Sequence, residues 1–417
     1  MQDSRKASWT PPARPEWVAR VNDEGRSLDL KGVIPLDENS LLETAMKNTG
    51  LSDFGSDPWR EPFSVFVKSL DEDAELNLMG RILTRTDILM WLEARLRIEN
   101  EYKLHPEIEN VEIKQPLWVF GQGRSGTTYL QRLLSLDPGN RTTPQWECMF
   151  PVPFTDADGV DRRYERGQAR ATQWARVTPE IDSMHEFNAD EPMETIYVES
   201  FTFRNTYWQN ILGMTNSFNA YMASESLLPG FQYLKRVYKY LEWTNPGRQW
   251  VVKSPASISH LPEVLKVFPD ARLVWAHRDP VKTMGSAVSL VSTLCWIRSD
   301  RRFAAGTFDS VTDQPTVARL LNGPIDWLAQ GVIDENRLCN VQYPDLIRDP
   351  VGTVAKIYQF YGLPFTDAAK KAITDYGNAH PRTNRPAHTY SSGADEQVQK
   401  ERAVFKRYQD YFQVPNE

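Results

Sequence analysis

After residue 116, four short apolar runs each lead into a turn and then into a segment with helical periodicity. They lie at 117–120, within 248–253, at 272–278 and at 338–341. Short apolar runs bounded by turn residues are typical of buried strands, and strands that alternate with helices predict a parallel sheet with right-handed crossovers. The pattern therefore predicts an α/β fold, in which a parallel sheet is flanked by helices on both faces.

The residues before the first run have helical periodicity. Apolar positions within 88–96 recur at helical spacing behind Thr86 and Asp87, which predicts a helix that begins there and has a packing role. We therefore expect a helical N-terminal segment over 1–115 that packs on an α/β domain over 116–417.

One long region of this domain, residues 150–245, is mainly helical and rich in aromatic residues, and is interpreted as a helical cap. Its aromatic density is compatible with an apolar pocket, although most of these side chains would individually be expected in the core of the cap. The aromatic residues of its second half are Phe201, Phe203, Tyr207, Trp208, Phe218, Tyr221, Phe231, Tyr233, Tyr238, Tyr240 and Trp243.

The composition narrows the class of protein. A chain of 417 residues with 41% hydrophobic and 25% charged residues is typical of a globular protein, and its net charge of −7 argues against a nucleic-acid partner. Three widely spaced cysteines form neither a disulfide framework nor a zinc site, so a reducing cytoplasm fits.

The first residues, MQDSRKASWTPPARPEW, have no apolar signal core. The least polar long stretch, SAVSLVSTLCWI, is too short and too rich in hydroxyl groups to span a bilayer. We therefore expect a cytoplasmic protein without stable membrane insertion, and no stretch indicates an oligomeric state.

The stretch PLWVFGQGRSGTTYL at 116–130 joins the first apolar run to a helix through a glycine-rich loop, an arrangement that presents backbone N–H groups to a phosphate. Gly121, Gly123 and Gly126 match the dinucleotide fingerprint, but the turn-rich sequence that follows lacks its second strand and acid. Against the P-loop pattern, Thr127 replaces the lysine and Arg124 is the nearby cation. The loop is therefore expected to bind a phosphate, with no obvious metal partner.

A second anion site is indicated by AHRDPVKTMGSAVSL. Asp279 is expected to cap a helix that begins at Pro280, which leaves Arg278 as the last strand residue and Ser286 two turns into the helix. Because ligands bind at the carboxyl ends of parallel strands, Arg278 and the phosphate loop should share one edge. The alternative is that Arg278 pairs with Asp279 or Asp349 and that Ser286 faces solvent. Two anion sites on one edge suggest a nucleotide with phosphates at two positions.

GRSGTTYL together with HRDPVKTMGSAVS resembles the paired signatures of sulfotransferases that use 3′-phosphoadenosine-5′-phosphosulfate (PAPS), with the serine eight residues after the arginine. The resemblance extends to the bacterial small-molecule branch through HPEI, WECMFPVP, MHEFNADEPMET, WVVKSP, FPDARLVWAHRDP, YPDLIRDP and HTY, over roughly residues 80–410. It implies a P-loop-like sulfotransferase core.

The resemblance also implies roles for individual residues. Arg278 and Ser286 would bind the 3′-phosphate, and the loop would bind the 5′-phosphosulfate. The residues implied for that loop are Gly123, Arg124, Ser125, Gly126, Thr127 and Thr128.

Sulfuryl transfer resembles phosphoryl transfer, in which the catalyst mainly positions groups and neutralises charge. Lys253 with Arg124 would stabilise the leaving oxygen without a metal. Many cytosolic sulfotransferases have a histidine base two places after this lysine, where the present chain has Pro255. His260 is interpreted as a helix-start residue.

The base that takes the proton of the acceptor has four candidates, with Glu147 ranked first and His185 second. Glu147 lies beside Trp146, where a water-poor cleft would raise its pKa. His185 titrates near neutral pH, or else is a core histidine. The remaining candidates, Glu191 and Glu194, are three residues apart and would share one face of a helix. Their alternative role is to hold His185 or Arg204.

The acceptor is expected to be a small, hydrophobic hydroxyl compound, such as a phenol, a sterol or a lipid alcohol. Basic residues are few near the aromatic region, which disfavours a heavily anionic acceptor. Two other functions fit the same sequence: a P-loop kinase or phosphotransferase, which would need magnesium and a triphosphate, and a non-catalytic nucleotide-binding protein.

Overall fold

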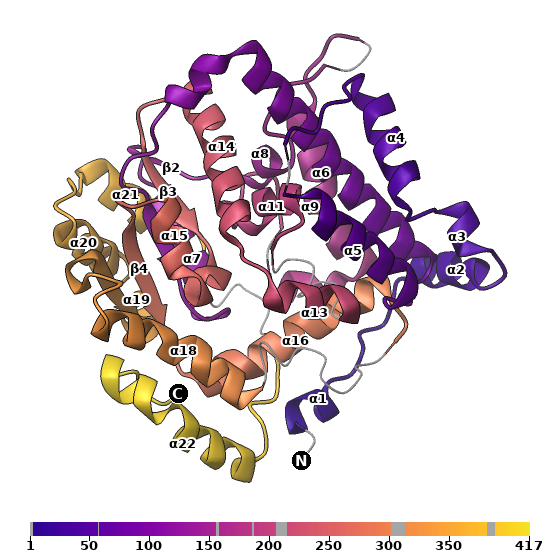
Figure 1. The fold of residues 1–417 in the computed structure, drawn as a ribbon. Coiled ribbons are helices and arrows are strands. Elements are labelled where there is room, and N and C mark those ends of the chain that lie inside the picture. Colours follow the sequence, from indigo (N-terminus) through magenta and orange to yellow (C-terminus); the bar gives the residue numbers. More distant parts are fainter. Residues whose placement is uncertain are drawn as a thin grey trace.

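The computed structural model describes residues 3–56, 58–155, 158–185, 187–205, 215–301, 313–381 and 388–417, and Figure 1 shows its fold. Within these residues a five-stranded sheet has the order β2-β3-β1-β4-β5, and every paired strand is parallel. The strands are β1 (Leu117–Phe120), β2 (Asn140–Arg141), β3 (Gln249–Lys253), β4 (Arg272–His277) and β5 (Leu338–Gln342). The predicted α/β fold with a parallel sheet flanked by helices is confirmed.

Alternation along β1 explains why both faces of the sheet are covered, since successive strand residues point to opposite sides. Leu117 and Val119 belong to a core cluster with α7 (Thr127–Ser135), α19 (Tyr343–Arg348), α20 (Pro350–Phe360) and α21 (Asp367–Ala379). Trp118 and Phe120 belong to a second, larger cluster on the other face. The helices of this cluster include α14 (Leu228–Thr244), α15 (Leu261–Val267), α16 (Pro280–Arg298), α18 (Gln314–Ala329) and α22 (Asp395–Phe412).

The residues before the sheet form helices that are coloured indigo to purple in Figure 1. They are α1 (Ser4–Ser8), α2 (Glu16–Gly25), α3 (Leu30–Val33), α4 (Glu38–Thr49), α5 (Arg60–Glu72), α6 (Leu78–Leu104) and the 3₁₀ helix η1 (Pro106–Asn110). Helices α2 to α6 lie together beside the sheet, whereas α1 lies apart from them and contacts α16. The division at residues 115 and 116 into an N-terminal segment and a sulfotransferase domain stays a prediction.

The region 150–245 and its surroundings contain short helices before α14. These are α8 (Gln145–Met149), α9 (Arg163–Ala171), α10 (Gln173–Val177), η2 (Pro179–Ser183), α11 (Ile196–Glu199), η3 (Ser200–Thr202) and α13 (Asn216–Ser224). Two further 3₁₀ helices, η4 (Pro255–Ser259) and η5 (Glu335–Arg337), follow β3 and precede β5. No helix within the described ranges is long and apolar enough to cross a membrane.

Two elements differ from the sequence predictions. Helix α6 begins at Leu78 rather than at Thr86, because Asn77 accepts a hydrogen bond from the Gly80 N–H and caps it, whereas Thr86 bonds back to the Ile82 carbonyl inside the helix. Strand β2 was not predicted from the turn-rich stretch after α7. It has only two residues, too few for a periodicity, and exists through its pairing with β3.

Most of the predicted aromatic cap residues that the structure describes are buried in the larger core cluster. Phe203 packs against the rings of Phe63 and Phe66, with centroid separations of 4.9 and 6.1 Å, and Tyr238 stacks on Trp250. This matches the interpretation of the aromatic region as core. Tyr207 and Trp208 lie outside the described residues.

Candidate functional site

The phosphate loop, residues 121–126, connects β1 to α7 in a conformation that requires glycine at two positions. Gly121 and Gly126 have φ values of 151° and 95°. A Cβ atom on Gly121 would lie 2.5 Å from the Ala276 carbonyl oxygen, and one on Gly126 would lie 2.8 Å from the Tyr343 ring. The loop thus passes close to β4 and α19 in a way that other residues would prevent.

The loop offers polar groups to an anion. Gly126 precedes the first turn of α7, so the N–H groups of Thr127 and Thr128 have no partner within the helix. The Ser125 hydroxyl is buried and has no hydrogen-bond partner among the described residues, while no atom lies within 4 Å of where a Cβ of Gly123 would stand. Such an arrangement fits a phosphate group at the positive end of a helix.

Arg124 lies in the same loop with a φ of 73°, a left-handed conformation that is uncommon for a residue with a side chain. Its Nε donates to the Ser286 hydroxyl over 2.9 Å, so the loop is tied to α16. Burial and the nearby charge of Arg278 lower the pKa of the Arg124 guanidinium from its ordinary value. Strain of this kind is typical of functional loops that the surroundings hold in place.

Lys253 ends β3 with a fully buried side chain. Its Nζ donates to the Thr128 hydroxyl over 3.0 Å and to Glu194 Oε1 over 2.9 Å. The Thr195 N–H also donates to the Lys253 carbonyl. The lysine therefore connects the first turn of α7 to Glu194, a residue far along the chain, and both are close to the phosphate loop.

Glu147 lies on α8 and accepts a hydrogen bond of 3.0 Å from Arg141. Burial raises the pKa of its carboxyl group from the ordinary value, although the charges of Arg141 and Arg163 oppose this shift. The neighbouring Cys148 thiol interacts electrostatically with both Glu147 and Lys253, and burial raises its pKa well above the usual range. The direction of the Glu147 shift is the one that the sequence predicted.

The other predicted bases have different surroundings. Glu191 forms an ion pair with Arg132 on α7, and Glu194 pairs with Lys253. The alternative pairing of these carboxylates with Arg204 is wrong, because Arg204 pairs with Glu225. His185 follows η2, and its ring stacks on Phe187 with centroids 4.4 Å apart. His260 directly precedes α15, which is the helix-start position expected for it, and its Nδ1 lies 3.1 Å from the Glu263 carboxylate.

Arg278 lies one residue beyond the end of β4, on the same sheet edge as the phosphate loop and Lys253. Its guanidinium donates to the Arg124 carbonyl over 3.0 Å and lies 4.0 Å from the centroid of Tyr343. Its other donors meet the side chain of Glu417, with distances of 3.0 to 3.3 Å. The pairing of Arg278 with Asp279 or Asp349, considered as an alternative, is therefore not the one present.

Asp279 caps α16 as predicted, because it accepts a hydrogen bond of 3.0 Å from the Val281 N–H. Arg402 on α22 pairs with the same carboxylate over 2.5 and 2.6 Å, which fixes α22 against the start of α16. Ser286 is only 3% exposed, so the alternative in which it faces solvent is wrong. Arg124, Arg278 and Ser286 together form what we call the arginine–serine cluster.

Two residues near this cluster were not singled out as site residues from the sequence. His388 places Nδ1 3.5 Å from the Ser286 hydroxyl and Nε2 3.0 Å from the Ser289 hydroxyl. Glu417 reaches Arg278 from beyond α22. The only signal for His388 was its presence in HTY, part of the family resemblance, and nothing local indicated Glu417.

Comparison with known proteins identifies the family and the fold of the chain. The model of the sulfotransferase family matches residues 116–367. The omega-hydroxy-beta-dihydromenaquinone-9 sulfotransferases Stf3 of Mycobacterium bovis and Mycobacterium tuberculosis are 24% identical over 266 residues. That alignment spans 61% of this chain and 64% of theirs.

Two crystal structures resemble nearly the whole molecule. The sulfotransferase STF1 of Mycobacterium tuberculosis H37Rv is 27% identical with a TM-score of 0.74, and covers 88% of this chain and 98% of its own. The sulfotransferase STF9 of Mycobacterium avium is 25% identical with a TM-score of 0.75, and covers 92% and 98%. The family model matches more than half of the length of this chain, and the chain therefore belongs to the sulfotransferase family.

Proposed function

We propose that this protein transfers a sulfuryl group from PAPS to a hydroxyl group of a small hydrophobic acceptor. The observation that carries the proposal is the meeting, at one edge of the sheet, of the phosphate loop with the arginine–serine cluster through the Arg124–Ser286 hydrogen bond. A nucleotide with phosphates on both its 5′ and 3′ positions would use both sites at once.

The residues present fit this donor. The Ser125 hydroxyl, which has no hydrogen-bond partner in the described part of the chain, and the N–H groups at the start of α7, which have no partner within the helix, suit a 5′-phosphate. Gly123, Arg124, Gly126, Thr127 and Thr128 would lie around it. The Arg278 fork already holds a carboxylate, that of Glu417, which is an anion with geometry similar to one edge of a phosphate. Arg278 and Ser286 would bind the 3′-phosphate where the Glu417 carboxylate now lies.

In catalysis, the side chains of this protein would position the two substrates and neutralise the charge that develops during the transfer. PAPS, when bound, supplies the sulfuryl group and leaves as the bisphosphate nucleotide. Lys253 and Arg124 would stabilise the charge that develops on the leaving oxygen. Lys253 is well placed for this, because it bonds to Thr128 in the first turn of α7.

Glu147 is our first candidate for the base that takes the acceptor proton. Its raised pKa suits a base that works near neutral pH, and Arg141 holds its carboxylate in place. Glu194 serves in this proposal as the counter-ion of Lys253, since the two are directly paired. His185 remains the second candidate.

The acceptor class rests on the relatives and on the composition of the chain. The Stf3 relatives are named as sulfotransferases of a menaquinone derivative, which is a lipid with a hydroxyl group. Among a phenol, a sterol and a lipid alcohol, we therefore favour a lipid alcohol. A cytoplasmic location and independence of metal ions are part of the same proposal, and the three free, buried cysteines fit such a location.

Thermal unfolding tests the donor site. In EDTA, 3′,5′-bisphosphoadenosine should stabilise the protein by about 2.7 kcal/mol at a hundredfold excess over its dissociation constant. ATP with magnesium should do much less. Equal stabilisation by the two nucleotides would argue for a phosphotransferase.

An acceptor screen with labelled PAPS, run in EDTA, tests the reaction. Label should move to hydrophobic alcohols and phenols without added metal. Binding of the bisphosphate without transfer to any hydroxyl compound would instead support a non-catalytic nucleotide-binding protein.

A further inference from the structure

His388 belongs to a segment that crosses the nucleotide-binding end of α16. This C-terminal segment, residues 388–394, leads directly into α22. A Cβ atom on Gly285 would lie 2.5 Å from the Ser391 carbonyl oxygen and 3.0 Å from the Tyr390 ring. The segment therefore reaches its place only because Gly285 has no side chain. Lys282, one turn earlier, donates to the Ser392 hydroxyl over 3.2 Å.

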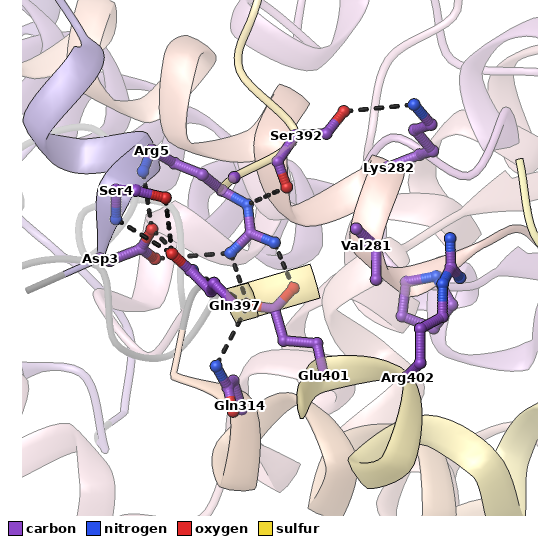
Figure 2. A network of polar contacts seen from close by, with 12 residues as sticks. Asp3, Ser4, Arg5, Val281, Lys282, Gln314, Ser392, Gln397, Glu401 and Arg402 are labelled. Carbon is purple, nitrogen blue, oxygen red and sulfur yellow. Dashed lines mark hydrogen bonds and ion pairs between the residues drawn. The ribbon is translucent and has the colours of Figure 1, made fainter. Parts of the chain in front are cut away.

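The other side of the segment is held by the N-terminus. Figure 2 shows Arg5 of α1 between Ser392 and Glu401 of α22. Its Nε donates to the Ser392 carbonyl over 3.1 Å, and its two terminal nitrogens bond both oxygens of Glu401. Arg5 and Glu401 are 2% and 0% exposed. A buried, two-pronged ion pair of this kind fixes both elements, because separating it would leave an uncompensated charge.

Further contacts join the same elements. The Ser4 hydroxyl donates to Gln397 over 2.6 Å and accepts from the Ala394 N–H over 2.9 Å, while Gln397 donates to Asp3 over 3.0 Å. We call Asp3 and α1 the N-terminal brace. Residues nearly four hundred positions apart are thus joined around the segment that carries His388.

The ring of His388 has one nitrogen engaged and one available. The Ser289 hydroxyl lies 3.0 Å from Nε2 and 4.0 Å from the Met184 sulfur, a much weaker acceptor, so we assign its proton to the contact with Nε2, which puts the ring proton on Nδ1. Nδ1 is 3.5 Å from the Ser286 hydroxyl, a distance at the limit of a hydrogen bond. Burial and the charge of Arg124 lower the pKa of His388 to about 4, so the ring is neutral near pH 7, and in this tautomer Nδ1 is its donor.

We propose that His388 is a third side chain that binds the 3′-phosphate, beside Arg278 and Ser286, and that the N-terminal brace positions it there. Arg5 and Glu401 are then positioning residues for nucleotide affinity, although they lie outside the binding site. This inference rests on the proposed function, since it assigns a new partner to the phosphate that the arginine–serine cluster would hold.

The test compares the affinities for 3′,5′-bisphosphoadenosine and for adenosine 5′-monophosphate, which lacks the 3′-phosphate. His388→Leu should weaken the bisphosphate about tenfold, the usual cost of losing a hydrogen bond to a charged group, and leave the monophosphate unchanged. His388→Asn keeps an N–H donor close to the position of Nδ1 and should recover part of the loss. Unchanged bisphosphate affinity in His388→Leu would overturn the assignment.

The brace is tested in the same assay. Arg5→Gln combined with Glu401→Gln removes the pair without leaving a lone buried charge, and Gly285→Ala displaces the segment without removing any polar group. Each should reproduce the loss seen in His388→Leu, and neither should add to it when combined with it, because both act through the same side chain.

Arg14→Gln is the matched control. Arg14 also belongs to the N-terminal residues and pairs with a carboxylate, Asp300, but it contacts the far end of α16 through the Trp296 and Ser299 carbonyls, at 2.7 and 2.9 Å. It should lower the melting temperature and keep the ratio of the two affinities. If the variant with both Arg5→Gln and Glu401→Gln also lowers the melting temperature and keeps the ratio of the two affinities, the brace stabilises the fold but does not position His388. If wild-type protein binds neither nucleotide, the proposed function itself fails.

Discussion

The two halves of the proposed nucleotide site are built in different ways. The phosphate loop is one contiguous stretch between β1 and α7, and its binding groups are mostly backbone N–H groups. The arginine–serine cluster combines Arg124 of that loop with Arg278 and Ser286 of the stretch after β4, and His388 and Glu417 reach it from the C-terminal part. The first half depends on local geometry and the second on long-range packing, so substitutions should affect them differently.

The largest effect is expected at Glu147 on α8, the first candidate for the base. Glu147→Gln keeps the shape of the side chain but cannot accept a proton, so turnover of an unactivated alcohol should fall about 10²- to 10⁴-fold while nucleotide affinity is kept. Burial raises the pKa of Glu147, and the base must be deprotonated to work. As the pH is lowered, activity should therefore be lost at a higher pH than the usual pKa range of a glutamate.

An acidic phenol sharpens this prediction, because its oxygen is already ionised and needs little help from a base. Glu147→Gln should recover much of its rate on such an acceptor. His185→Gln and Glu194→Gln should each lose less on the alcohol. If Glu147→Gln keeps near-full activity there while His185→Gln is inactive, the base is His185.

The next effect concerns Lys253, at the end of β3. Lys253→Met keeps the apolar stem in its buried position but removes the charge that would stabilise the leaving oxygen, so kcat should fall about 10²- to 10³-fold. This loss should be the same for alcohols and acidic phenols, in contrast to Glu147→Gln. Steady-state kinetics on both acceptors would measure it, and recovery on the phenol would show that Lys253 does not act on the leaving group.

A smaller effect, limited to one ligand, is expected in the arginine–serine cluster. Arg278→Ala should weaken 3′,5′-bisphosphoadenosine by roughly 10- to 100-fold, since losing a charged hydrogen bond costs roughly 1.5 to 3 kcal/mol. Adenosine 5′-monophosphate should bind almost as before. Isothermal calorimetry on both ligands decides this, and an equal loss for both would mean that Arg278 acts structurally on the phosphate loop.

The smallest effect, and one of opposite sign, is expected at Glu417. Its carboxylate occupies the Arg278 fork in the structure, so a 3′-phosphate has to displace it. Because an accessible pair contributes about 0.2 to 1 kcal/mol, Glu417→Gln should tighten bisphosphate binding less than about sixfold, and more at low salt than at high salt. Weaker binding in Glu417→Gln would show that the carboxylate supports the site instead of competing for it.

The sequence by itself determined the strands and the features that are local. Runs such as 272–277 contain enough apolar residues to indicate a strand. The glycines of the phosphate loop predicted a turn, and Gly121 and Gly126 have the positive φ values of such a turn. The helix cap at Asp279 could be predicted because it is also local: its hydrogen-bond partner, the Val281 N–H, is two residues away. The parallel order of these strands then placed the loop, Lys253 and Arg278 on one edge.

Only the tertiary structure decided which side chains meet. A carboxylate has no preferred partner within its own stretch of chain, so nothing in the sequence could pair Glu194 with Lys253, Arg278 with Glu417, or Arg5 with Glu401. Helix α6 shows the same limit, because the eight residues before Thr86, six of which are buried, became helical only where other parts of the chain covered them. The spacing of residues along the chain reveals interactions between residues that are a few positions apart. Many charged side chains could pair with any one partner, and only the folded chain decides which of them comes close enough to do so.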